Sequence, residues 1–204
     1  MITILRPFVD INLKNLNYNY EYLQKFVGDC RVLAVIKADA YCHGAVKVAK
    51  SLSVTNIYGF AVALLEEIVE LRDNEITKPI LHLGKFSLAN KEIIDDRTIF
   101  TINSIDDFDS IDSYYNETGK FVRAHVKFDT GMGRMGFHYK EVYSVISRIR
   151  ECRGLVLDGV YSHFATVENP ETTFIRIQSS RFDKIKNIIS KEFPGLLYHI
   201  SNSG

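Results

Sequence analysis

The sequence has few cysteines and no net charge, and each shortage excludes a class of protein. Its 204 residues include three cysteines, an odd number without C-x-x-C spacing, which argues against a disulfide framework and a structural zinc site. The 25 Lys and Arg residues balance 25 Asp and Glu residues, so the basic field that nucleic-acid or membrane-surface binding needs is missing. A small-molecule ligand and a reducing compartment are the remaining expectations.

Long apolar stretches and targeting signals are also missing. No stretch approaches the roughly 20 apolar residues that span a bilayer. The opening MITILRPFVD lacks the basic start and the cleavage motif of a signal peptide. No linker rich in Pro, Gly or Ser interrupts the chain, and its length makes one large domain over 1–204, or one domain with an appendage, the default. We therefore expect a soluble, cytoplasmic protein.

Short apolar runs alternate with amphipathic segments along the chain. Seven runs have the length and continuous apolarity of parallel strands covered on both faces: 31–37, 57–62, 79–84, 97–102, 121–128, 155–161 and 196–201. Helix-like spacing of apolar residues marks 11–28, 62–74, 141–154 and 172–193. This alternation predicts a right-handed parallel α/β array.

Two parallel architectures fit this array, an open doubly wound sheet and a TIM-type (β/α)8 barrel. The first predicted strand is followed by Lys-Ala-Asp-Ala-Tyr instead of the G-x-G-x-x-G of a dinucleotide-binding sheet, which favours the barrel. A closed barrel needs eight strands and typically about 250 residues. Since the sequence stops at SNSG just after the seventh strand, we expect an incomplete barrel of about seven strands.

Residues that can do chemistry follow the ends of four predicted strands. Lys37 ends the first, Lys127 lies at the end of the fifth with Arg134 on the loop after it, His163 follows the sixth, and Asn202 and Ser203 follow the seventh. Barrel enzymes assemble their active sites from the loops at the carboxyl ends of the strands. These residues are therefore expected to share one face of the barrel.

Most of these residues, and Tyr41 four positions after Lys37, can be interpreted either as ordinary structural residues or as functional ones. Lys37 either extends its ammonium to solvent or supplies a partly desolvated amine as a Schiff-base nucleophile or general base. Tyr41 is either a packing aromatic or a hydroxyl that reaches an anion. In HVKFDTGMGRMGF (125–137), Arg134 either closes a glycine turn or binds a phenolate or carboxylate. His163 can be a satisfied core histidine, and HISNSG (199–204) either an ordinary turn or a phosphate loop.

Several ordered motifs resemble those of alanine racemases, fold-type III enzymes that use pyridoxal 5'-phosphate (PLP). They are RPFVDINLKNLNYN, AVIKADAYCHGA, FAVALLEEIVELR, VKFDTGMGRMGF, GVYSHFAT and HISNSG. Together they extend over essentially the whole chain. The sequence is therefore identified as the N-terminal barrel portion of this family.

The resemblance implies a role for each candidate residue. Lys37 holds the cofactor as a Schiff base and serves as one of two catalytic bases, while Tyr41 and Ser203 help bind its phosphate. Arg134 contacts the ring phenolate oxygen, and Lys127 matches a lysine that is often carbamylated. In addition, His163 lies near the pyridine ring and Asn202 adjoins the phosphate loop.

The resemblance also implies what these residues lack. The second base of the family is a tyrosine in a C-terminal β-domain that acts across a homodimer interface, and an arginine beyond the seventh strand faces the ring nitrogen. We therefore expect the intact protein to racemise alanine, supplying D-alanine for peptidoglycan, and these residues alone to be inactive or nearly so. Cys42 stands where the family usually has glycine.

Two rival interpretations remain open, together with a serine-preferring variant of the main one. A single-domain PLP-binding homeostasis protein would share the barrel and the strand-1 lysine but not the motifs DTGMGRMGF and YSHFAT. A Schiff-base aldolase barrel would use a lysine without any cofactor, generally on a later strand. A racemase that prefers serine differs mainly in pocket residues that lie outside this sequence.

Overall fold

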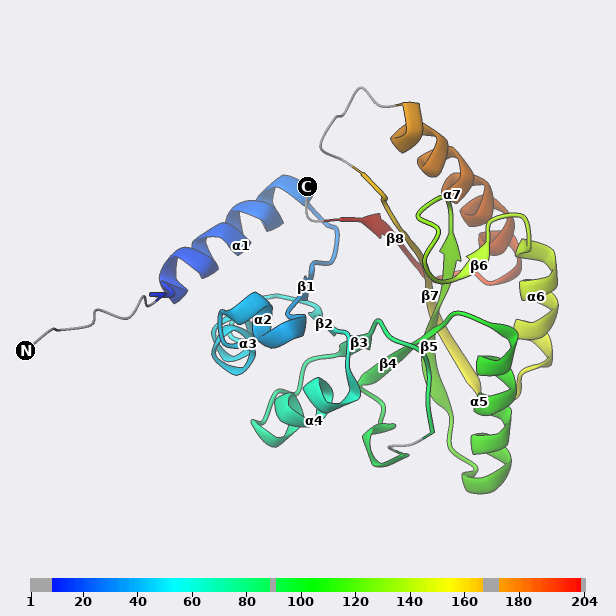
Figure 1. Ribbon diagram of the computed structural model, residues 1–204, viewed down its shortest axis with the longest axis horizontal. Helices are drawn as coiled ribbons and strands as arrows, with labels where there is room; N and C mark the ends of the chain where they lie inside the picture. Colours follow the sequence, from blue (N-terminus) through cyan, green and yellow to red (C-terminus); the bar gives the residue numbers. More distant parts are fainter. Residues whose placement is uncertain (1–8, 89–90, 167–172, 203–204) are drawn as a thin grey trace, which may run out of the picture. The chain divides into compact units, whose positions relative to one another are not determined.

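The computed structural model describes residues 9–88, 91–166 and 173–202 (Figure 1). The chain folds as two units, Met1–Ile80 and Leu81–Gly204. Lys37 and Tyr41 belong to the first unit. The other candidate residues belong to the second unit, except that Ser203 lies outside the described residues.

The first unit alternates short strands with helices. Its elements are α1 (Leu13–Val27), β1 (Leu33–Val35), α2 (Lys37–Cys42), α3 (Ala45–Ser53), β2 (Gly59–Val62), α4 (Leu65–Asp73) and the start of β3 (Ile80–His82). The side chain of Asn12 caps α1 by accepting hydrogen bonds from the amides of Lys14 and Asn15. Helix α3 buries Val48, Ala49 and Leu52, as its apolar spacing requires.

The second unit contains longer strands with helices along one side (Figure 1). Its elements after β3 are η1 (Lys91–Ile93), β4 (Thr98–Ile102), α5 (Ile105–Thr118), β5 (Val122–Asp129), β6 (Phe137–His138), α6 (Val142–Glu151), β7 (Leu155–His163), α7 (Thr173–Glu192) and β8 (Leu197–Ser201). Helix α5 begins where the Asp107 carboxylate accepts hydrogen bonds from the amides of Asn103 and Ser104, and it ends at Gly119 with φ of 70°.

The seven main strands follow the order β1-β2-β3-β4-β5-β7-β8, and the short β6 pairs with β5. The pairings β1 with β2, β4 with β5, β5 with β7 and β7 with β8 are all parallel. Strands neighbouring one another in chain order with helices between them are the pattern of a (β/α)8 barrel. The prediction of an incomplete TIM-type barrel is therefore confirmed for the described residues.

Some elements differ from the sequence prediction. Strand β1 is shorter than the predicted 31–37 and partly exposed, with Val35 at 44% exposure. Among the described strands β1 pairs with β2 alone. Helices α3 and α5 and strand β6 lie outside the ranges marked from the sequence. Within the described residues, no helix is both long enough and apolar enough to cross a membrane.

Candidate functional site

Lys37 is the first residue of α2, immediately after β1, and the residues that follow it in α2 form a left-handed turn. Ala38 to Cys42 all have positive φ, between 52° and 66°, and the Lys37 side chain is half-buried. A left-handed conformation costs an L-residue roughly 1–2 kcal/mol. Five consecutive residues in this conformation persist only where the surroundings fix them. The sequence predicted a lysine at a strand end but not this turn, because alanine and tyrosine give no local signal for positive φ.

Hydrogen bonds hold the turn at both ends. The Ile36 amide donates to the Ala61 carbonyl on β2, and the Ala40 amide donates to the Ile36 carbonyl, both at 2.9 Å. At the far end, the Asp39 carboxylate accepts from the Ala45 amide at 2.6 Å, where α3 begins. The turn leaves Tyr41 51% exposed.

Lys127 lies near the end of β5 among aromatic and hydroxyl side chains. It is 6% exposed, and its Nζ lies 5.5 Å from the ring centroid of Tyr161, its register partner on β7. Burial raises the pKa of Tyr161 to about 12, so the phenol stays neutral. Its hydroxyl lies 3.0 Å from Thr101 Oγ1, which donates to the His82 carbonyl at 2.7 Å. Lys127 therefore lies beside a neutral phenol that is hydrogen-bonded to Thr101.

The glycine loop after β5 is folded by its own residues. The Asp129 carboxylate accepts from the Gly131 amide at 2.7 Å and from the Arg134 amide at 3.1 Å. Gly136 has φ of 108°, and a Cβ there would lie 2.7 Å from the Lys127 carbonyl oxygen. Gly136 thus lets the returning chain pass against β5, while the Arg134 side chain stays exposed.

His163 and Asn202 follow neighbouring parallel strands. His163 ends β7, where it is the register partner of Ser201 on β8, and Asn202 comes directly after β8. Within the second unit, Lys127, Arg134, His163 and Asn202 therefore all lie at or just beyond the carboxyl ends of β5, β7 and β8. This edge is where barrel enzymes carry their active sites.

Comparison with known proteins identifies the family of this chain. The family described as "Alanine racemase, N-terminal domain" matches residues 11–204. The chain belongs to this family. The alanine racemase 2 of Caldanaerobacter subterraneus subsp. tengcongensis is 35% identical over 209 residues, which cover 100% of this chain and 54% of that protein.

Solved structures similar to this chain include alanine racemases. Alanine racemase of Clostridium difficile 630 has 32% identity and a TM-score of 0.87, covering 95% of this chain and 51% of that one. Alanine racemase of Bacillus anthracis with bound L-Ala-P has 29% identity and a TM-score of 0.84, covering 97% and 53%. The chain thus spans about half the length of the alanine racemases it matches.

Gln178 on α7 is a site-supporting residue that the sequence reading missed. It is fully buried, and its Nε2 donates to the His163 carbonyl at 3.1 Å and to Thr130 Oγ1 at 3.2 Å. Its Oε1 accepts from the Ala165 amide at 3.0 Å. The signal was available, because Gln178 shares the buried helical face of Phe182, Ile185 and Ile189, where a polar side chain needs partners.

A buried histidine pair was missed as well. His125 Nδ1 on β5 lies 3.0 Å from His199 Nε2 on β8, and the His199 ring stacks on Tyr161 with a centroid distance of 4.8 Å. The strand between them carries Gly159, where a Cβ would lie 3.0 Å from His125 Nε2. Burial lowers the pKa of His125 to about 3 and that of His199 to about 4, so both imidazoles stay neutral.

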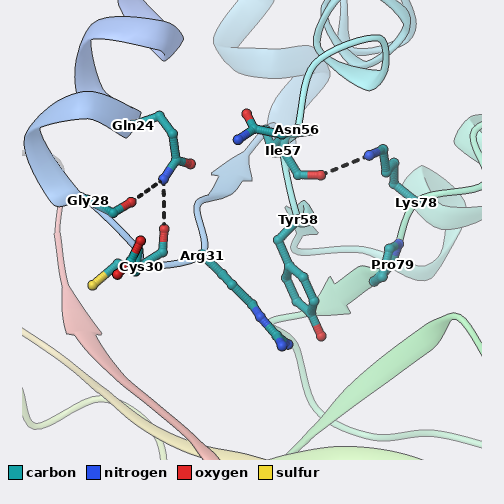
Figure 2. Close-up of a pocket in the computed structure, with 10 residues that line it drawn as sticks. Gln24, Gly28, Cys30, Arg31, Asn56, Ile57, Tyr58, Lys78 and Pro79 are labelled. Carbon is teal, nitrogen blue, oxygen red and sulfur yellow. Dashed lines mark hydrogen bonds between the residues drawn. The ribbon is translucent and has the colours of Figure 1, made fainter.

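Two of the cavities bordered by described residues lie in the first unit. One, of about 610 Å³, opens at the amino ends of β1 and β2, where Gln24 donates to the Gly28 and Cys30 carbonyls and Arg31 extends beside Tyr58 (Figure 2). The other, of about 640 Å³, borders the left-handed turn at Asp39 and His43. The first cavity is thus at the strand ends opposite to Lys37.

Proposed function

We propose that the protein containing this chain is a PLP-dependent alanine racemase that interconverts L-alanine and D-alanine. The observation that carries the proposal is the position of Lys37, in a fixed turn directly after β1 of an alanine racemase N-terminal domain. An amine at the carboxyl end of a barrel strand is placed where substrates of such enzymes bind.

The side chains available in each unit fit the chemical groups of PLP. The first unit offers the Lys37 amine for covalent attachment and the hydroxyl of the exposed Tyr41 for the phosphate. The second unit offers the exposed Arg134 guanidinium for the phenolate oxygen, and His163 and Asn202 at neighbouring strand ends. Ser203, the second phosphate residue of the proposal, lies outside the described residues.

Lys37 and Lys127 carry different parts of the proposed chemistry. When bound, PLP supplies an electron sink that stabilises negative charge at the α-carbon of the amino acid. Lys37 takes the α-proton from, or returns it to, one face of that carbon. Carbamylation of the buried Lys127 would convert its cation into an anion able to hold the Arg134 guanidinium in place.

The remaining parts of the proposal concern the whole protein. A tyrosine serving as the second base, and an arginine beside the ring nitrogen, would come from chain outside these 204 residues, in a homodimer. We propose that the protein works in the cytoplasm and supplies D-alanine for peptidoglycan. The three free cysteines Cys30, Cys42 and Cys152 are compatible with a reducing compartment.

An absorbance experiment tests the role of Lys37. Purified protein mixed with PLP is expected to develop a yellow absorbance band that borohydride bleaches, with the label on Lys37, whereas the Lys37→Ala variant develops none. An equal band in both proteins would show that another amine is modified and would contradict the proposed site.

Chiral product analysis tests the reaction itself. The longer protein that contains this chain is expected to convert L-alanine into D-alanine and to prefer alanine over serine. Faster turnover of serine would identify a serine racemase. PLP binding without turnover of either amino acid would favour a cofactor carrier instead.

A further inference from the structure

Glu67 makes the first contact of the left-handed turn with another element. The Ala38 amide, the first after Lys37, donates to Glu67 Oε1 at 2.5 Å. Glu67 is the third residue of α4, beyond β2, so this hydrogen bond joins the end of β1 to the segment that follows the neighbouring strand. A charged acceptor makes a backbone hydrogen bond stronger than a neutral one does.

The two carboxylate oxygens of Glu67 have separate partners. Oε2 accepts from the amides of Ala63 and Leu64 at 2.8 and 2.9 Å, which satisfies donors at the start of α4. The other oxygen, Oε1, accepts from the Ala38 amide. The negative charge also lies in the first turn of the helix, where the helix dipole favours it. One side chain thus caps a helix and orients the amide next to Lys37.

Asp39 holds the opposite end of the turn and does not duplicate this contact. Its carboxylate accepts from the Ala45 amide, and its carbonyl accepts from the Gly44 amide at 2.9 Å. Both contacts lie on the α3 side of the turn, away from Lys37. At the Lys37 end, the backbone hydrogen bonds of Ile36 and Ala40 flank the turn, and Glu67 supplies the side-chain acceptor for the peptide that follows Lys37.

We infer that Glu67 is a positioning residue for Lys37: its Oε1 fixes the left-handed turn at Ala38 and so sets the direction in which the lysine side chain leaves the backbone. This inference rests on the proposed function, in which Lys37 carries PLP. Because Ala38 is exposed, water can replace a lost acceptor there. Losing Oε1 is therefore expected to affect the placement of Lys37 more than the stability of the fold.

The Glu67→Gln variant separates the two roles of Glu67. Its amide oxygen can still accept from Ala63 and Leu64, but its NH2 group then faces the Ala38 N–H, donor against donor. Borohydride trapping of PLP on Lys37 is expected to slow roughly tenfold, the size of a lost charge-assisted hydrogen bond. The Ala38 amide should also lose its downfield NMR shift and its protection from hydrogen exchange.

A matched control and a rescue complete the experiment. Glu66→Gln removes the same charge from the same helical turn at an exposed residue and is expected to trap PLP like the parent protein. Adding Ala38→Gly to Glu67→Gln should restore part of the trapping rate, because glycine adopts positive φ without the steric cost. If Glu67→Gln slowed trapping only by weakening the cap of α4, Ala38→Gly would not restore the trapping rate.

The outcomes keep this inference distinct from the proposed function. If the parent protein is trapped on Lys37 and Glu67→Gln matches Glu66→Gln in rate and Ala38 amide shift, the positioning role is wrong and the function stands. If the parent protein is not trapped on Lys37, the proposed function fails. The Ala38 amide shift, measured without PLP, would then still decide whether Glu67 holds the turn.

Discussion

Single residues in this chain are constrained by the space and the backbone geometry around them. Gly136 combines a φ of 108° with backbone atoms of Lys127 at 2.7–3.0 Å from a Cβ position, whereas Gly133, with φ of 72°, has nothing within 4 Å. Both belong to the same glycine loop. The pattern DTGMGRMGF indicates a tight turn in general, but only the structure separates a glycine required by packing from one required by φ alone.

Replacing these two glycines by alanine should have unequal effects. Gly136→Ala is expected to lower the free energy of unfolding by about 2–4 kcal/mol, since it adds a clash with the Lys127 backbone to the strain of positive φ. Gly133→Ala should cost only about 1 kcal/mol. Urea denaturation of both variants measures the difference, and equal losses would contradict the packing role of Gly136.

The histidine pair predicts how stability depends on pH. The folded protein keeps His125 and His199 neutral, with pKa values of about 3 and 4, whereas an unfolded chain protonates histidine below a pKa of about 6.5. Below that pH the unfolded state binds more protons, so stability is complete above pH ~6.5 and falls as the pH drops towards about 4. The slope reaches up to about 1.4 kcal/mol per pH unit for each histidine.

Denaturation curves between about pH 7 and pH 5 test this dependence. The His125→Gln variant should lose stability less steeply on acidification than the parent protein. His138→Gln, at an exposed histidine, serves as the control and should leave the slope unchanged. A slope that is the same in all three proteins would rule out the buried pair as its source.

At the scale of elements, the helices and strands that carry a periodic apolar pattern could be predicted, and those without such a pattern could not. Strands β5 and β7 correspond to the predicted strands at 121–128 and 155–161, and helix α7 corresponds to the predicted helix at 172–193. These elements could be predicted because a long apolar run indicates a buried strand and helical spacing of apolar residues indicates a helix. The short β6 carries no such run, and it forms because Gly136 brings Phe137 beside Phe128.

Helix α7 also supports the strand ends through Gln178. Gln178→Leu should lower the free energy of unfolding by about 2–3 kcal/mol, because it leaves the His163 carbonyl and the Ala165 amide without their described partner. Ser180→Ala, at an exposed residue of the same helix, should change it by less than about 0.5 kcal/mol. Thermal unfolding compares the two. Similar melting temperatures would show that water satisfies the freed groups.

At the scale of the whole molecule, the barrel and the strand-end residues could be predicted because motif order and strand order agree. Lys37 and Lys127 end predicted strands and His163 follows one, whereas their joint role in one site stays a prediction. The contacts that fix them could not be predicted. Glu67 and Gln178 act through partners 29 and 15 residues away, and no local pattern encodes such pairings.

The proposal of a second base outside these residues makes a prediction for the chain as a unit. The 204 residues alone should form D-alanine roughly a thousandfold more slowly than the longer protein, the usual contribution of a general acid or base. Chiral chromatography of the product, normalised to PLP trapped on Lys37, measures the ratio. Comparable turnover by both proteins would place the complete catalytic machinery within these residues.

Gly159 has a consequence for sequence variation. The His125 ring reaches His199 by passing over a strand that offers no side chain at that point. A side chain at position 159 would therefore leave no room for an imidazole at position 125. With a smaller residue at position 125, position 159 would no longer need to be glycine. Related sequences should change these two positions together, so that a histidine at the first is found with a glycine at the second.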